Sequence, residues 1–251
     1  MRIKFNKEIE FFLKKNFLPQ SYLFKKRLER SIKNNDEKEL RLVKNFIKPG
    51  TDTIDVGVYR GVYSFEMSKY SNIVHAFEPN PVIFKDINKN LKKIIKNIRL
   101  YNFALSNKNE IMNLNIPIRD KKYNKKNYEE YFQMGRATIH NMNKFDKFET
   151  FKVDAKKLDA INFDNDISFI KIDVEGHETE VIQGSENTIK KFKPILLVEI
   201  EEKHNQKKVS TTLNYIKSLG YNSFFFENNK LKNTDNLDDL NLFNNYIFKP
   251  K

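Results

Sequence analysis

An acidic turn that contains a glycine and a histidine follows an apolar segment of this chain. The segment 168–172 is apolar except for its first residue and Lys171, and the turn after it carries Asp173, Glu175, His177 and Glu178. In α/β proteins, sites form beyond the carboxyl ends of parallel strands. Carboxylates there can orient a cationic group, and a carboxylate or an imidazole can accept the proton of a hydroxyl group. We therefore take Asp173, Glu175 and His177 as candidate catalytic residues.

The same four side chains are also metal-ligand types. Consecutive positions on one turn rarely converge on a single ion, however, and no second His/Asp group lies at a partner spacing in this sequence. We assign no metal. The turn could instead have a purely structural role, in which Glu178 and Glu180 stabilise the next helix by interacting with the positive end of its dipole.

A second candidate site lies at Asp55-Val56-Gly57-Val58-Tyr59-Arg60-Gly61. Two glycines at a strand-to-helix turn allow the backbone to approach a ligand closely and to point amide groups at it. The spacing matches neither a nicotinamide fingerprint nor a Walker-type phosphate loop. A carboxylate before the first glycine suits a ligand with a positively charged end. Asp55, Gly57, Tyr59 and Gly61 are thus candidate cofactor residues, and a tight turn with a capping Asp is the alternative.

Glu78 strengthens the cofactor interpretation. It ends a β-favouring segment, 73–77, and follows Gly57 by 21 residues. A carboxylate at this place accepts hydrogen bonds from both hydroxyls of an adenosine ribose. S-adenosylmethionine satisfies both signals, because it combines an adenosine with a sulfonium and an amino-acid end. Asn80 is expected at the start of the next helix, and Ala104 is expected beside the adenine.

The elements that position these residues alternate between strand and helix patterns. We expect strands over 51–56, 73–77, 98–103, 168–172 and 195–200, and helices over 62–70, 80–95, 180–192 and 209–219. Two final strands, 221–226 and 245–248, follow each other without a helix, so that one should be antiparallel. This pattern predicts an α/β fold with a doubly wound, mostly parallel sheet.

Two segments lie outside this alternation. Residues 1–45 read as amphipathic helices with a break near Pro19, and form either a cap over the core or a basic surface that touches a membrane. Residues 107–150 are polar and too long for an ordinary connection. We expect them to be an acceptor-binding lid inserted into a catalytic domain that spans 46–251.

Composition excludes several classes of chemistry. The 251 residues include no cysteine, which removes disulfides and cysteine nucleophiles. No apolar run is long enough to cross a bilayer and no signal peptide is evident, so we expect a cytoplasmic protein. The net charge of +13 fits an anionic partner, but it also fits the lysine-rich coding of an A/T-rich genome.

Taken together, these residues resemble the FkbM-type S-adenosylmethionine-dependent methyltransferase family over about 46–249. The resemblance is carried by Asp55-Val56-Gly57, by Ala76-Phe77-Glu78-Pro79-Asn80 and by the segment 170–185. It implies a class I methyltransferase (Rossmann-like) fold with a seven-stranded sheet whose last strand is antiparallel. It also implies O-methylation, often of sugars in glycans or of secondary metabolites. On that pattern Asp55, Gly57 and Gly61 bound the methionine end, Glu78 binds the ribose, and Asp173 separates donor from acceptor.

One position departs from the family pattern, and two other functions stay open. The family usually has Ala-Asn after the first glycine, where this chain has Val58-Tyr59. A non-catalytic binding protein is therefore one alternative. An RNA ribose methyltransferase is another, although base methylation is disfavoured: the chain lacks a cysteine nucleophile, and Asp173 does not begin an Asp/Asn-Pro-Pro-aromatic motif. The expected acceptor is a small molecule or a sugar, and a nucleotide- or lipid-phosphate linkage would suit the lysines and tyrosines of 107–150.

Overall fold

A computed structural model describes residues 18–34, 37–118, 137–139, 147–201 and 208–251. Its centre is an eight-stranded sheet with the order β10-β9-β11-β8-β7-β1-β2-β3. The bounds are β1 Asp52–Val56, β2 Val74–Phe77, β3 Ile98–Tyr101, β7 Ile167–Ile172, β8 Ile195–Glu199, β9 Tyr221–Glu227, β10 Lys230–Asn233 and β11 Asn245–Pro250. Strands β3, β2, β1, β7 and β8 are mutually parallel, and β11 runs antiparallel to both β8 and β9.

The sheet confirms the predicted fold and adds one strand to it. The extra strand, β10, forms a hairpin with β9 through Asn228 and Asn229, which both have left-handed backbones with φ of 50° and 60°. Two consecutive left-handed residues make the turn that matches the twist of a β-hairpin, and asparagine tolerates this conformation better than most residues. The sequence expectation of seven strands therefore fell short at this edge.

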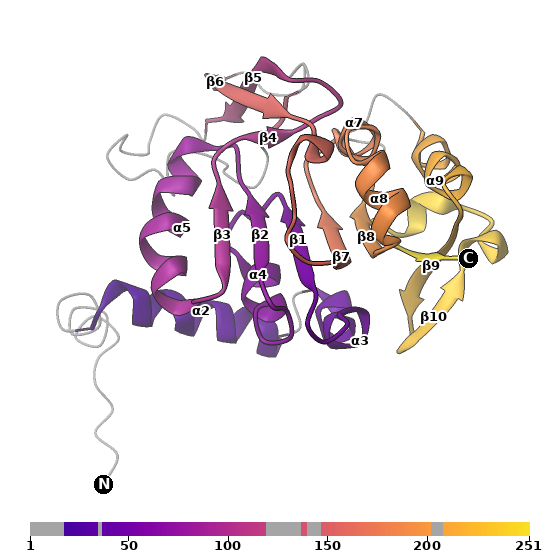
Figure 1. Cartoon of the computed structure of the whole chain (residues 1–251), viewed down its shortest axis with the longest axis horizontal. Helices are drawn as coiled ribbons and strands as arrows, with labels where there is room; N and C mark the ends of the chain where they lie inside the picture. The colour runs from indigo at the N-terminus through magenta and orange to yellow at the C-terminus, as the bar shows by residue number, and fades with distance from the viewer. Residues whose placement is uncertain (1–17, 35–36, 119–136, 140–146, 202–207) are drawn as a thin grey trace, which may run out of the picture.

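Helices cover both faces of the sheet (Figure 1). On one face lie α2 Gln20–Asn34, α3 Val43–Phe46, α4 Val62–Met67 and α5 Pro81–Ile94, with the 3-10 helix η1 Lys38–Leu42 between α2 and α3. On the other face lie α7 Glu178–Gln183, α8 Glu186–Phe192 and α9 Val209–Ser218. Three further 3-10 helices are η3 Leu158–Ala160, η4 Thr234–Asn236 and η5 Leu240–Leu242. Strands β1 and β7 are buried at every residue, as expected for parallel strands covered on both faces.

The single helix expected over 180–192 is divided into α7 and α8 next to Gly184. A Cβ at Gly184 would overlap the carbonyl oxygen of Ser106, so only a glycine lets these two segments of backbone approach. Through this contact the backbone at Ser106 lies directly against the end of α7.

The segment around the predicted lid forms a second, smaller sheet. Its order is β4-β6-β5, with β4 Ala104–Leu105, β5 Glu110–Pro117 and β6 Phe148–Lys156. Figure 1 shows it above the carboxyl ends of β1, β2 and β3. Most of the predicted lid, including the Tyr- and Lys-rich 121–131, falls outside the described residues.

Helix α2 packs on the body of the protein. Phe24 and Leu28 are buried in the same core cluster as residues of α3, α4 and α5. The first part of the predicted N-terminal extension, 1–17, lies outside the described residues. Over the part of the chain that the structure describes, no helix has the length and apolar character needed to cross a membrane.

Candidate cofactor and active site

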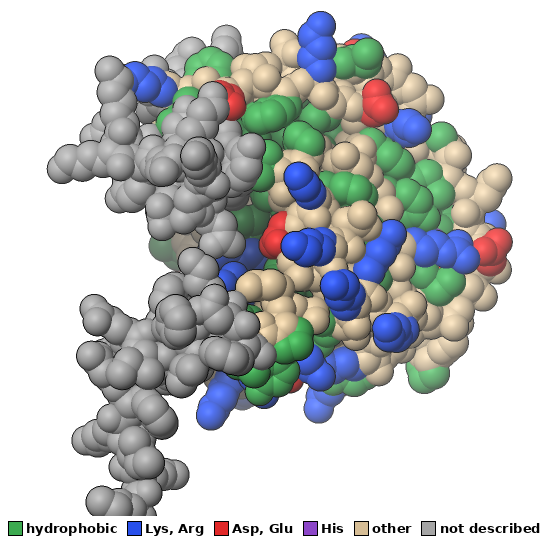
Figure 2. Space-filling model, turned by 90° about the vertical axis from the view of Figure 1, so that its left-hand side faces the viewer, with side chains coloured by type: hydrophobic (Ala, Val, Ile, Leu, Met, Phe, Trp, Pro, Cys, Tyr) green, Lys and Arg blue, Asp and Glu red, His purple; other side chains and the backbone are tan. Residues whose placement is uncertain are grey.

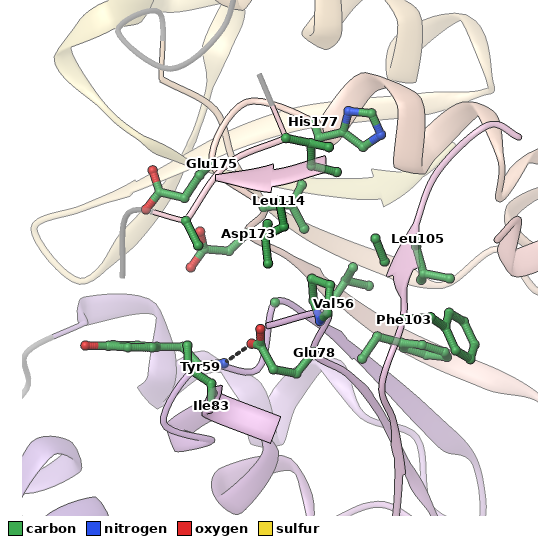
Figure 3. A pocket seen from close by; sticks show the side chains of 17 residues that line it. Val56, Tyr59, Glu78, Ile83, Phe103, Leu105, Leu114, Asp173, Glu175 and His177 are labelled. Atoms are coloured by element: carbon green, nitrogen blue, oxygen red, sulfur yellow. Dashed lines mark hydrogen bonds between the residues drawn. The ribbon is translucent and has the colours of Figure 1, made fainter. Parts of the chain in front are cut away.

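A cavity opens at the carboxyl ends of β1, β2 and β7, beneath the smaller sheet. It is lined by Val56, Gly57, Tyr59, Phe77, Glu78, Pro79, Ile83, Phe103, Ala104, Leu105, Leu114, Ala137, Ile139, Asp173, Val174, Glu175 and His177. Figure 3 shows Glu78 and Asp173 on opposite sides of the same hollow. Elements far apart in sequence thus bring together Gly57, Tyr59, Glu78, Ala104, Asp173, Glu175 and His177, all of which the sequence analysis had selected.

At Gly57 the backbone that follows β1 lies close to the backbone that follows β7. Its φ of 83° is left-handed, and a Cβ there would overlap the carbonyl oxygen of Asp173. Its N–H donates to the carbonyl of Phe77 at 3.0 Å, which holds the turn against β2. The glycine therefore keeps the first strand end, the second strand end and Asp173 within one site.

Glu78 is buried at 5% exposure, and both of its carboxylate oxygens accept backbone hydrogen bonds. The N–H of Tyr59 donates to Oε2 at 2.8 Å, and the N–H of Asn80 donates to Oε1 at 2.9 Å. Burial raises the pKa of the Glu78 carboxyl to about 7, although these two N–H groups lower it. Each oxygen keeps acceptor capacity, because a carboxylate oxygen can accept more than one hydrogen bond. The carboxylate is therefore fixed in position while it remains able to bind a diol.

Tyr59 contributes its backbone and not its hydroxyl to this arrangement. Its φ of 48° is unusual for a non-glycine residue, and the conformation aims the Tyr59 N–H at Glu78. Figure 3 shows the ring pointing away from Glu78, and the side chain is 38% exposed. The guanidinium of Arg60 lies 5.2 Å from the centre of this ring.

Three of the selected cofactor residues lie behind the cavity wall. Asn80 caps α5, accepting from the N–H groups of Val82 and Ile83 at 3.0 and 3.3 Å. Gly61 begins α4 with a φ of 77° and faces Leu91. Neither residue lines the cavity. Both support the elements that form its wall.

Asp55 is the third of these residues, and it points to the opposite face of the sheet from its neighbour Val56. The Ser64 hydroxyl donates to Asp55 Oδ2 at 2.5 Å. Burial raises the pKa of Asp55 to about 6, although Lys171 and Ser64 act against this. Asp55 is thus not among the residues that line the cavity, and its role at the methionine end of a cofactor stays a prediction.

Asp173 is held by a buried lysine. Lys171 Nζ donates to Asp173 Oδ2 at 2.7 Å, and the exposures of the two side chains are 5% and 30%. Burial alone would lower the pKa of Lys171, but Asp173 and Asp55 outweigh it and hold that pKa above its ordinary value. Asp173 therefore binds the buried Lys171 ammonium and also lines the cavity.

Hydrogen bonds within the turn after β7 help to hold its conformation. Glu175 and Gly176 both have left-handed backbones, with φ of 52° and 104°, and Glu178 Oε1 accepts from the N–H of Gly176 at 2.9 Å. His177 is 3% exposed, and its Nε2 lies 2.9 Å from the Ser106 hydroxyl. Its Nδ1 is 3.7 Å from Glu180 Oε2. The imidazole thus borders the cavity while its ring nitrogens engage residues of neighbouring elements.

Some cavity residues escaped sequence analysis. Leu114, Ala137 and Ile139 come from the smaller sheet and its bridge, and the Thr138 hydroxyl donates to the Glu175 carbonyl at 2.9 Å. Glu199, at the end of β8, lines a second, acidic crevice with Asp173, Glu175, Gly176, Glu178 and Glu201. No group of three or more potential metal-ligating side chains is arranged around an ion site in the described part of the chain.

The family model described as the methyltransferase FkbM domain matches residues 55–223. No curated protein matches the chain. Methyltransferase FkbM from Methylobacillus flagellatus is similar in structure, with a TM-score of 0.51 and 13% identity. The match covers 84% of this chain and 50% of that one, so this chain spans about half of the relative's length.

Two further solved structures resemble the chain more weakly. An rRNA methylase from Streptococcus thermophilus has a TM-score of 0.46 and 9% identity, over 85% of this chain and 95% of that one. A Streptococcus mutans protein solved with S-adenosylhomocysteine has a TM-score of 0.49 and 10% identity, over 85% and 96%.

The family match spans more than half of the chain. It begins at Asp55, includes Gly57, Glu78 and Asp173, and ends at Ser223 in β9. By this match the chain belongs to the FkbM methyltransferase family, a family of S-adenosylmethionine-dependent methyltransferases.

Proposed function

We propose that this protein transfers the methyl group of S-adenosylmethionine to a hydroxyl of a sugar, a glycan precursor or another small molecule. The observation that carries the proposal is that Glu78 and Asp173 line one cavity, with the Gly57 turn between their strands. Both carboxylates lie at the carboxyl edge of the parallel sheet, after β2 and β7, with β1 between these two strands. Glu78 would bind the ribose diol there.

The donor would lie between β1 and β2. Glu78 would accept the ribose hydroxyls, while Phe103, Ala104 and Leu105 would edge the adenine. The backbone of the Gly57 turn would face the methionine end, and Asp173 would lie near the sulfonium. A carboxylate stabilises this cation and is already in place before the reaction begins.

The acceptor would enter from the side of the smaller sheet. Leu114, Ala137 and Ile139 supply an apolar wall there, and the hydrogen bond from Thr138 to Glu175 ties that wall to the acidic turn. The acceptor oxygen attacks the methyl carbon, the carbon–sulfur bond breaks, S-adenosylhomocysteine leaves, and the hydroxyl proton passes to a base. Asp173, Glu175 and His177 are the candidate catalytic groups, and the Lys171 ammonium fixes Asp173 by a hydrogen bond.

The net positive charge does not select a macromolecular partner. Figure 2 shows Lys and Arg side chains spread over the face on the α5 side, among hydrophobic and neutral ones. A nucleotide- or lipid-linked sugar would also be attracted to such a surface, since the attraction depends on charge and not on the rest of the ligand.

The test is methyl transfer from labelled S-adenosylmethionine to three acceptor panels: nucleotide-linked sugars, lipid-linked glycans and RNA transcripts. We expect label in a sugar hydroxyl with the wild type and none with Asp173→Ala, whose fold is checked by circular dichroism. Label confined to RNA would replace the proposed acceptor with a ribose. Cofactor binding without transfer to any of the three panels would instead indicate a binding protein.

A further inference from the structure

We propose that Lys171 is a positioning residue of this site: its buried ammonium holds the Asp173 carboxylate in one orientation at the wall between donor and acceptor. This inference rests on the methyl transfer proposed above and assigns a role to a residue that does not line the cavity.

The geometry of the pair is that of a charged hydrogen bond. Lys171 lies within β7, and Asp173 follows that strand two residues later, so both side chains start from the same face. The Nζ–Oδ2 distance is 2.7 Å, and Nζ also lies 4.9 Å from the centre of the Tyr63 ring. The lysine is therefore surrounded by protein while its partner reaches the cavity.

A buried ammonium needs such a partner, because burial removes its hydration and close opposite charges must compensate for that loss. Asp55 is a second carboxylate on the neighbouring strand, paired with Lys171 in the β1–β7 register. Its Oδ2 accepts from Ser64, and its Oδ1 has no hydrogen-bond partner among the described residues. Of the two carboxylates, Asp173 is thus the one that the lysine binds directly.

The pair also balances charge at a crowded edge. Glu199 and Glu175 share a crevice with Asp173. Without the ammonium, the Asp173 carboxylate would face these groups with no cation bound to it. With the ammonium, its orientation is set by the strand itself, so that little reorganisation accompanies transfer of a methyl group past it.

The experiment compares two variants of the full chain with a matched control. Lys171→Met removes the charge and keeps the length of the side chain. Lys171→Arg keeps the charge but changes the geometry of the donor. Lys190→Met removes an exposed lysine whose Nζ lies 2.5 Å from Glu186 Oε2 on α8, away from the site. The readouts are kcat, the dissociation constant of S-adenosylhomocysteine, the melting temperature and the orientation of Asp173 in crystals.

We expect kcat of Lys171→Met to fall roughly tenfold to a hundredfold, as for other misplaced catalytic groups. Binding of S-adenosylhomocysteine should change much less, since Glu78 and the Gly57 turn are intact. Lys190→Met should retain the wild-type kcat. A purely structural role for Lys171 would lower the melting temperature and leave kcat per folded molecule unchanged, and that result would overturn the proposal.

Two cases need a separate readout: a Lys171→Met variant that does not fold, and a wild type that transfers no methyl group. If Lys171→Met does not fold, Lys171→Arg decides: wild-type kcat together with a displaced Asp173 side chain in that variant would contradict a positioning role. If the wild type transfers methyl to no acceptor, the proposed function fails, and the crystal orientation of Asp173 in Lys171→Met still tests the positioning claim. An unchanged Asp173 side chain there would overturn it.

Discussion

The carbonyl oxygen of Asp173 occupies the space that a Cβ at Gly57 would need. This contact joins the two strand ends that form the site, and it depends on backbone atoms that cannot move aside cheaply. The glycine is therefore required by packing as well as by its φ of 83°.

We predict that Gly57→Ala destabilises the protein by about 3 kcal/mol or more, because overlap with backbone forces β1 and β7 apart. Gly50→Ala is the matched control: Gly50 has a similar φ of 78°, but no atom lies within 4 Å of the added Cβ. That variant should cost only about 1 kcal/mol, the price of a left-handed non-glycine residue. Urea unfolding of both variants measures the difference, and equal losses would show that the Asp173 contact is unimportant.

The raised pKa of Glu78, about 7, predicts a pH dependence of cofactor binding. The ionised carboxylate accepts hydrogen bonds from both ribose hydroxyls, whereas the protonated form has less acceptor capacity. Affinity for S-adenosylhomocysteine should therefore increase as pH rises through about 7 and level off above it. Titration calorimetry between pH 5.5 and 8.5 checks this, with Glu78→Gln expected to bind weakly and with little pH dependence. Affinity that falls over this range would refute the assignment.

Glu199 predicts a pH dependence of stability. Burial raises the pKa of its carboxyl above the ordinary value; Asp173, Glu175 and Glu201 add to the rise, and Lys171 opposes it. Because the folded state holds this proton more tightly than the unfolded state does, the wild type loses stability as pH rises from the unfolded pKa to the folded one. Glu199→Gln carries no such charge. Its melting temperature should thus rise relative to the wild type between pH 5 and pH 9, and a constant difference would contradict the raised pKa.

Local patterns in the sequence were sufficient for most of the fold and for the centre of the site. Gly57, Glu78 and Asp173 each follow a β-favouring segment, and parallel strands bring such ends to one edge. Asp55 shows the limit of reasoning from position alone. It precedes the glycine by two residues, but side chains alternate across a strand, so Val56 faces the cavity side and Asp55 faces Lys171.

Contacts between distant segments could not be read from the sequence. Leu114, Ala137 and Ile139 reach the cavity because β5 pairs with β6 and bridges to Thr138, a register that no local pattern specifies. The pairing of His177 with Ser106 likewise depends on the close approach at Gly184. The β9–β10 hairpin is different, since the adjacent Asn228 and Asn229 were a usable turn signal.

Binding of S-adenosylmethionine, measured by titration calorimetry on the wild type and on Glu78→Ala, tests most directly whether the cavity between β1, β2 and β7 is the donor site. We predict one molecule bound per chain of the wild type and a loss of at least tenfold in affinity for Glu78→Ala, whose circular dichroism should match the wild type. No binding to the folded wild type, or equal binding to both proteins, would contradict the account.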